Sequence, residues 1–234
     1  MILRIPWLLL SAANFIIQLL YFYRDSSTGL FRAKKITTPL LLFSGLLIVI
    51  VNHSGVPLVP GVILLAMGLG ELGIEGSSVV EKHGGEEAGA GGSIIVLLAA
   101  ILFLLVNIFL GIVLIHRNGA AGLPAASAIA IGITGLKLVI SIRVFKPEAV
   151  VRTQMLLYGA GLAVLCSGGI ADLMNGLSRL GLAALVLVVS DTLVLIRMGA
   201  GFDKSTKSGF RTLLIFLIVI LVLYYFYIWL LISI

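Results

Sequence analysis

The chain has 234 residues, of which 60% are hydrophobic and only 11% are charged, and its formal net charge is +6. A soluble domain carries about 25% charged residues and about 45–50% apolar ones, so this composition excludes a water-soluble globular protein. The positive charge calls for no nucleic-acid partner, because Lys and Arg beside a membrane attract anionic lipid headgroups.

Eight apolar runs follow one another along the chain. Each approaches the roughly 20 residues that a helix needs to cross a membrane, and none alternates like a lipid-facing strand. The sequence therefore predicts an all-α integral membrane protein, a bundle of eight transmembrane helices that forms one domain over residues 1–234. The predicted spans are 2–23, 36–52, 56–75, 94–115, 124–143, 153–173, 180–198 and 212–234.

Two connections have a distinctive composition. "NHSGVP" follows the second run and predicts a tight hairpin into the third. The polar, glycine-rich stretch "GSSVVEKHGGEEAGAGG" follows the third run and predicts a flexible cytoplasmic loop. No internal repeat is evident, so the chain lacks the inverted-repeat signature of many transporters.

The basic residues divide unequally between the two sides of the predicted bundle. Loops on one side hold twelve, loops on the other side hold Arg4, Arg117 and Arg179, and Lys137 lies within a span. By the positive-inside rule the richer side faces the cytoplasm, which places both termini on the outer side of the cytoplasmic membrane. The twelve are Arg24, Arg32, Lys34, Lys35, Lys82, Arg143, Lys146, Arg152, Arg197, Lys204, Lys207 and Arg211.

The segment "GLGELG", residues 68–73, fits the G-x-G-x-x-G pattern of dinucleotide-binding loops. That pattern requires a preceding strand and a soluble βαβ unit, whereas this segment lies in a membrane span. We expect its glycines to remove side-chain bulk so that neighbouring helices approach closely. Glu71 then remains as a carboxyl group at membrane depth.

Ionisable residues within membrane spans are functional hypotheses by default, because burying them is costly. Glu71 and Asp191 each lie one to two turns from the cytoplasmic end of their predicted helices, so we expect them to form a pair. Asp172 falls at the outer end of the sixth run, where we expect a solvated helix end. An ion pair between Glu71 and Lys137 that serves only folding is an alternative.

Further polar residues reach the same level as this carboxyl pair. One polar pocket, open to the cytoplasm and closed toward the outside, would hold Gln18, Lys35, Thr37, Thr38, Lys137, Ser141 and Tyr158. Simpler explanations remain open. Lys137 could snorkel to the interface, the threonines and Ser141 could bond to their own helix backbone, and Tyr158 could be an interfacial anchor.

Other chemistries lack the residues that they need. His53, His83 and His116 all fall in predicted loops and Cys166 is the single cysteine, which argues against an intramembrane zinc site and excludes an internal disulfide. No G-x-S-x-G motif is present, and no histidine is placed to activate Ser190. If the protein is an enzyme, we therefore expect carboxyl groups to carry the reaction, with no metal or other cofactor.

Several segments resemble the lysoplasmalogenases, also called YhhN-like proteins, which are eight-helix membrane proteins. The segment "LAALVLVVSDTLVLIRMGAGF" is similar to the family's Ser-Asp motif, with Ser190 and Asp191 intact. "KKITTPLLLFSGLL" resembles the family's Lys-Pro segment at Lys35, and "LLAMGLGELGIEG" its Gly-Asp motif, with Glu71 in place of aspartate. "MLLYGAGLAVL" matches a tyrosine segment at Tyr158, and "LYYFYIWLLISI" matches the closing helix at Tyr225.

The chain departs from the family pattern at three further positions. Ile36 replaces a proline, Asn107 a histidine of the fourth helix, and Trp229 a polar residue of the last helix. The resemblance still implies an enzyme that hydrolyses the vinyl-ether bond of a lysoplasmalogen to a fatty aldehyde and a glycerophospho-alcohol. Its substrate would be a lysophospholipid or ether lipid drawn from the membrane.

Vinyl-ether hydrolysis requires one carboxyl group as acid and one carboxylate that stabilises a cation and activates water, as in glycosidases. Glu71 and Asp191 would fill these roles, with Lys35 and Lys137 on the headgroup phosphate. The resemblance adds Tyr158, Ser190 and Tyr225 as substrate-binding residues. Two other functions fit the same residues: a small proton- or cation-coupled transporter, and a degenerate family member that only binds lipid.

Overall fold

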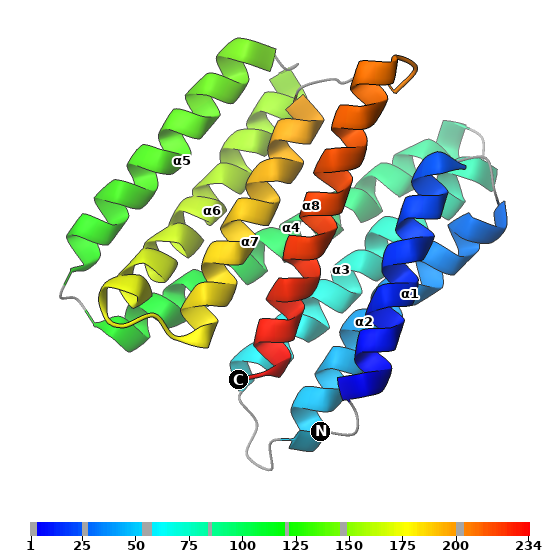
Figure 1. The fold of residues 1–234 in the computed structure, drawn as a ribbon. Coiled ribbons are helices and arrows are strands. Elements are labelled where there is room, and N and C mark those ends of the chain that lie inside the picture. Colours follow the sequence, from blue (N-terminus) through cyan, green and yellow to red (C-terminus); the bar gives the residue numbers. More distant parts are fainter. Residues whose placement is uncertain are drawn as a thin grey trace. The chain divides into compact units, whose positions relative to one another are not determined.

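The structure is a computed structural model, and it describes residues 4–24, 28–52, 58–83, 86–119, 122–145, 149–199 and 204–234. Within these ranges the chain forms eight α-helices and no strand (Figure 1). The helices are α1 (Arg4–Tyr23), α2 (Thr28–Asn52), α3 (Leu58–His83), α4 (Glu86–Asn118), α5 (Leu123–Phe145), α6 (Ala149–Met174), α7 (Arg179–Gly199) and α8 (Lys207–Ile232).

The all-α prediction is confirmed, and the apolar helices are those of an integral membrane protein. Among the described residues, six helices are long and apolar enough to cross a membrane: α1, α2, α4, α5, α6 and α8. The apolar part of α3, Val59–Gly73, is shorter. At 1.5 Å per residue the 26 residues of α8 extend about 39 Å, more than the roughly 30 Å hydrocarbon core of a bilayer.

The predicted loop over "GSSVVEKHGGEEAGAGG" was wrong. The α3 helix continues to His83 and α4 begins at Glu86, so within the described residues this stretch is helical. Likewise, α2 begins at Thr28, well before its apolar run. Hydropathy marks only the apolar part of a helix, and the extensions of α2, α3 and α4 all lack a proline that would stop the helix. Most of the predicted "NHSGVP" hairpin lies outside the described residues.

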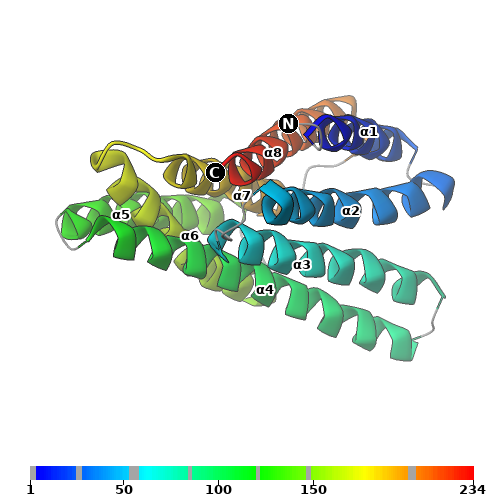
Figure 2. The same cartoon turned by 90° about the horizontal axis from the view of Figure 1, so that it is seen from below.

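The chain divides into two compact units, residues 1–106 and 107–234. In the first unit α2 lies beside both α1 and α3, as Figure 2 shows. The indole Nε1 of Trp7 in α1 donates to the carbonyl of Leu41 in α2 at 3.2 Å. The α2 and α3 helices pack against each other, and Leu41 and Leu42 of α2 and Ile63 and Leu64 of α3 are fully buried.

In the second unit α5, α6, α7 and α8 run alternately up and down (Figure 1). The α7 helix packs against α6 on one side and α8 on the other. Its central position explains why, among its described side chains, Val189 is the one large apolar residue that is exposed. By contrast, α5 exposes a row of them, including Ile129, Ile133 and Leu136. Such apolar outer faces suit lipid and not water.

Glycines permit close helix contacts in both units. A Cβ atom built on Gly70 would lie 2.8 Å from the Phe103 ring, and one on Gly68 would lie 3.0 Å from the Phe43 ring. For Gly68 and Gly70 this confirms the expectation that glycines of "GLGELG" remove side-chain bulk. In the second unit the contact is tighter, because a Cβ on Gly111 in α4 would lie 2.6 Å from the backbone oxygen of Val164 in α6.

Candidate functional site

The carboxyl group of Asp191 is held inside the second unit by side chains from two other helices. Asp191 lies in α7 and is half-buried. Its Oδ2 accepts a hydrogen bond from the Tyr158 hydroxyl of α6 at 2.6 Å and another from Nδ2 of Asn107 in α4 at 3.2 Å. Three helices thus meet at one carboxylate oxygen.

The hydrogen bonds from Tyr158 and Asn107 offset the free-energy cost of burying the Asp191 carboxylate. A carboxylate in the centre of a membrane helix costs about 2.5–3.5 kcal/mol. Hydrogen bonds to a charged group return about 1.5–3 kcal/mol each. Asn107 is itself buried in an apolar helix, so the surrounding side chains hold its amide in place and keep it out of solvent. Replacing Asp191 by an apolar residue would leave the Tyr158 hydroxyl and the Asn107 amide without their acceptor.

Asn107 was misjudged from the sequence. It appeared only as a departure from the family's histidine, whereas the structure places its amide directly on Asp191. The signal that could have identified it is its position as the one amide in the apolar run "ILFLLVNIFLGIVLI". A buried amide in such a run needs a polar partner.

Tyr227 of α8 was missed entirely. Its side chain is fully buried, and its hydroxyl has no hydrogen-bond partner among the described residues. Trp229, which marked a family departure, is instead 41% exposed and stacks on Phe226, with ring centroids 5.9 Å apart. Tyr227, unlike Trp229, is therefore buried in the protein at this end of α8.

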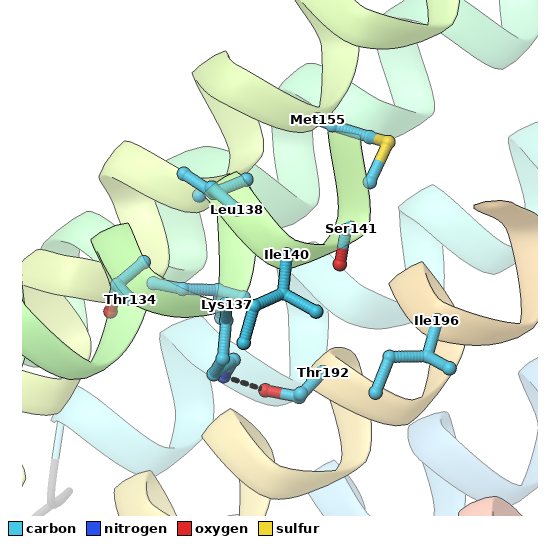
Figure 3. A pocket seen from close by; sticks show the side chains of 10 residues that line it. Thr134, Lys137, Leu138, Ile140, Ser141, Met155, Thr192 and Ile196 are labelled. Carbon is cyan, nitrogen blue, oxygen red and sulfur yellow. Dashed lines mark hydrogen bonds between the residues drawn. The ribbon is translucent and has the colours of Figure 1, made fainter. Parts of the chain in front are cut away.

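Lys137 lies in the same unit beside a cavity of about 250 Å³ between α5, α6 and α7 (Figure 3). Its ammonium group donates to the hydroxyl of Thr192, the residue after Asp191. This bond ties Lys137 of α5 to α7, and the alternative that the lysine snorkels to the interface stays a prediction. Thr192 donates in turn to the Val188 carbonyl at 2.5 Å, which fixes its hydroxyl as an acceptor for Lys137.

Two other predicted substrate-binding residues, Ser190 and Tyr225, also lie in the second unit. Ser190 is buried within α7. Tyr225 is half-buried in α8, and its ring centroid lies 6.1 Å from that of Tyr224. Both stay predictions as substrate-binding residues, since neither has a described contact with Asp191.

Glu71 and Lys35 belong to the first unit. Glu71 is half-buried in α3. The ammonium group of Lys35 lies 4.0 Å from the centroid of the Phe31 ring, a cation–π contact within α2. Because Glu71 lies in one unit and Asp191 in the other, the predicted pairing of the two carboxyl groups stays a prediction. The alternative pairing of Glu71 with Lys137 has the same standing.

A second polar cluster joins α1 to α2 in the first unit. Nδ2 of Asn14 donates to the hydroxyls of Thr37 at 2.7 Å and Thr38 at 3.0 Å, and Nε2 of Gln18 donates to Thr38 at 3.1 Å. Both threonines also bond to their own helix backbone, at the carbonyls of Ala33 and Lys34, as one interpretation of the sequence expected. These groups are therefore satisfied locally.

The prediction that Asp172 forms a solvated helix end was wrong. Asp172 is only 3% exposed. Its carboxylate accepts from Nδ2 of Asn118 at 3.1 Å and from the backbone N–H of Ser178 at 2.5 Å. It thereby ties α4 to the turn that begins α7, where Ser178 caps the helix by accepting from Gly181 N–H. A structural role accounts for this carboxylate.

Comparison with known proteins identifies no relative: no protein-family model, no curated protein and no solved structure matches the chain. The resemblance to the lysoplasmalogenases therefore rests on the segments quoted above. Within the described part of the chain, no three His, Cys, Asp or Glu side chains cluster as metal ligands would.

Proposed function

We propose that the protein is an intramembrane lipid hydrolase that cleaves the vinyl-ether bond of a lysoplasmalogen. The observation that carries the proposal is the Asp191 carboxylate, bound by Tyr158 and Asn107 in the helix that also bounds the Lys137 cavity. An ionisable residue within a membrane segment is a functional hypothesis by default, and this one lies in a helix that bounds a cavity. An apolar cavity with a cation suits a lipid that has an anionic headgroup.

The proposed reaction needs only carboxyl groups and water. A carboxylic acid protonates the alkene carbon remote from oxygen, and the electron pair of the double bond forms the new C–H bond, which leaves an oxocarbenium ion. Water adds to that ion and loses a proton to a carboxylate. The hemiacetal then collapses to a fatty aldehyde and a glycerophospho-alcohol, so that one water is consumed.

The hydrogen bonds at Asp191 support a division of roles. An ionised carboxyl group only accepts hydrogen bonds, and Oδ2 of Asp191 accepts two. In the proposed mechanism Asp191 is therefore the carboxylate that stabilises the cation and activates water, and Glu71 is the acid. Tyr158 and Asn107 act through Asp191 as positioning residues.

We further propose eight membrane spans, with both termini outside and the site toward the cytoplasm. The alternating helices of the second unit support this orientation. The end of the unit where α5 and α7 finish and α6 and α8 begin carries Arg143, Arg152, Arg197, Lys204, Lys207 and Arg211, and the opposite end carries Arg117 and Arg179. Asp191 lies eight residues, about 12 Å, from the cation-rich end of α7.

The test is aldehyde release from a lysoplasmalogen by the purified protein. We expect wild type to release aldehyde at the same rate with and without a chelator. Asp191→Asn keeps the shape and removes the charge, so turnover should disappear while the melting temperature stays within a few degrees. Asp172→Asn is the matched control, because it makes the same change at the carboxylate with a structural role. The folded fraction of this variant should retain turnover.

Two results would contradict the proposal. Wild type could fail to release aldehyde from any lysoplasmalogen, or Asp191→Asn could retain full turnover. If wild type releases no aldehyde but carries protons into vesicles, the protein is a transporter. If it does neither and still binds lysolipid, it is a lipid-binding protein.

A further inference from the structure

The cavity between α5, α6 and α7 has one polar wall. Most of its lining is apolar, from side chains such as Leu138, Ile140 and Leu162. Four residues bring polar atoms to it: Thr134, Lys137, Ser141 and Thr192. Figure 3 shows Lys137 reaching across from α5 to Thr192 of α7. The Thr192 hydroxyl already donates to Val188 and accepts from Lys137, so the groups that face an anion are the Lys137 ammonium and the hydroxyls of Thr134 and Ser141.

Lys137 keeps hydrogen-bonding capacity for such a group. An ammonium group has three N–H donors, and the Thr192 hydroxyl takes one of them. Among the described residues, no acidic side chain accepts a hydrogen bond from Lys137. The nearby Asp191 accepts its hydrogen bonds from Tyr158 and Asn107 instead. The lysine thus contributes charge and free donors to the cavity.

Thr134 provides an independent indication. Its side chain is 4% exposed and lines the cavity, yet its hydroxyl has no hydrogen-bond partner among the described residues. Buried hydroxyls in proteins nearly always have a partner, and a threonine in a helix usually finds one in its own backbone. An acceptor atom of a bound molecule would satisfy this hydroxyl.

The cavity extends toward the cationic end of the second unit. Thr134 and Leu162 lie at its deep part, and Ser141, Met155 and Ile196 lie near the ends of α5, α6 and α7. Arg143, Arg152 and Arg197 occupy those ends. An anion that approaches from this end meets increasing positive potential before it reaches Lys137.

We propose that this cavity binds the headgroup phosphate of a single-chain phospholipid, with Lys137 and the Thr134 hydroxyl as its principal contacts. A cavity of about 250 Å³ has room for such a headgroup. In the proposal the hydrocarbon chain lies outside the cavity, among the apolar helix faces. The choice of a lipid rests on the proposed function, but the binding does not depend on hydrolysis.

The test compares two ligands that share one acyl chain: a lysophosphatidylethanolamine and the corresponding monoacylglycerol, which has no phosphate. Binding is measured to the full chain in neutral maltoside micelles, so that no other phosphate competes. We expect wild type to bind the lysophospholipid at least tenfold more tightly. Lys137→Met keeps an unbranched side chain one atom shorter, removes the charge and should remove that preference. Lys207→Met, the same change at an exposed lysine of the same end, should preserve it.

Thr134→Val separates a ligand contact from a structural one. It replaces an unpaired hydroxyl by a methyl group of the same size, so the melting temperature of the free protein should stay equal or rise. The affinity for the lysophospholipid should nevertheless fall severalfold, and that for the monoacylglycerol should not change. Glycerol 3-phosphate at the same concentration should displace little lysophospholipid.

Four results would overturn the proposal. These are equal affinity of wild type for the two ligands, a preference that survives Lys137→Met, no loss of lysophospholipid affinity in Thr134→Val, and full displacement by glycerol 3-phosphate. The last result would indicate a site for soluble phosphate compounds. If the phosphate preference appears as expected but no lysoplasmalogen is cleaved, the proposed function fails and the phosphate site stands.

Discussion

At Asp191 two donors of different kinds converge on one oxygen atom. The Tyr158 hydroxyl at 2.6 Å is the shorter contact, and the Asn107 amide at 3.2 Å comes from a different helix. A short hydrogen bond to a carboxylate is worth more than one between neutral groups. Of the two donors, Tyr158 therefore makes the stronger hydrogen bond, which holds the Asp191 carboxyl group in place and favours its ionised form.

Removing the Tyr158 hydroxyl should slow the proposed reaction without unfolding the protein. Tyr158→Phe deletes one hydrogen bond to a charged acceptor, worth about 1.5–3 kcal/mol, so we expect turnover to fall about 10- to 150-fold. The measurement is the initial rate of aldehyde release at saturating substrate. Tyr23→Phe, at an exposed tyrosine of α1, should leave the rate unchanged. A Tyr158→Phe rate equal to wild type would remove Tyr158 from the site.

Among the residues around Asp191, the sequence identified Asp191, Lys137 and Tyr158, whereas it missed Tyr227 and misjudged Asn107. Asp191 and Lys137 were identified because a charge in an apolar run is unambiguous. Tyr227 was not, because a tyrosine in "LYYFYIWLL" could face lipid as easily as the protein interior. In a helix that is apolar on all sides, periodicity does not show which face is buried. That information exists only once the helices are packed.

At the scale of the helix, the apolar centres were predicted well and the ends were not. Each of the eight runs coincides with one helix, but α2, α3 and α4 extend beyond the apolar residues. A helix ends where its backbone hydrogen bonds end, whereas hydropathy records only where its side chains change character. The end of α3 at His83 is marked in the sequence by Gly84 and Gly85 and not by a change in hydropathy.

The crossing of α4 and α6 gives a prediction at the same scale. Gly111→Ala would place a methyl group 2.6 Å from the Val164 backbone oxygen, and a backbone atom cannot rotate away. The helices would have to separate, so we expect a loss of about 1–3 kcal/mol in stability. Because Asn107 lies one turn away in α4, turnover should fall as well. The melting temperature in detergent and the rate of aldehyde release are the measurements.

Gly132→Ala is the matched control in α5. A Cβ on Gly132 would meet nothing within 4 Å. Alanine in the middle of a helix is favoured over glycine by about 0.5–1 kcal/mol, so this variant should be as stable as wild type or more so. Equal stability of the two variants would mean that α4 and α6 do not cross at Gly111.

At the scale of the whole molecule, the distribution of charge predicts its orientation. The connection between α7 and α8 includes exposed Ser205, and the turn between α6 and α7 includes exposed Asn175. If the cation-rich end faces the cytoplasm, a protease site inserted at Ser205 should be cut only from inside. One inserted at Asn175 should be cut only from outside. Oriented membrane vesicles provide the measurement, and the reverse pattern would invert the proposed orientation of the site.

The two tryptophans of the chain lie in different units and in opposite surroundings. Trp7 is 2% exposed in the first unit, whereas Trp229 in the second is 41% exposed. Indole fluorescence therefore offers a separate signal from each unit. Lipids with brominated chains should quench the emission of Trp229 and spare that of Trp7. In the Trp7→Phe variant the remaining tryptophan fluorescence comes from Trp229 and reports on the second unit alone. The binding of a ligand to that unit could then be measured in a bilayer.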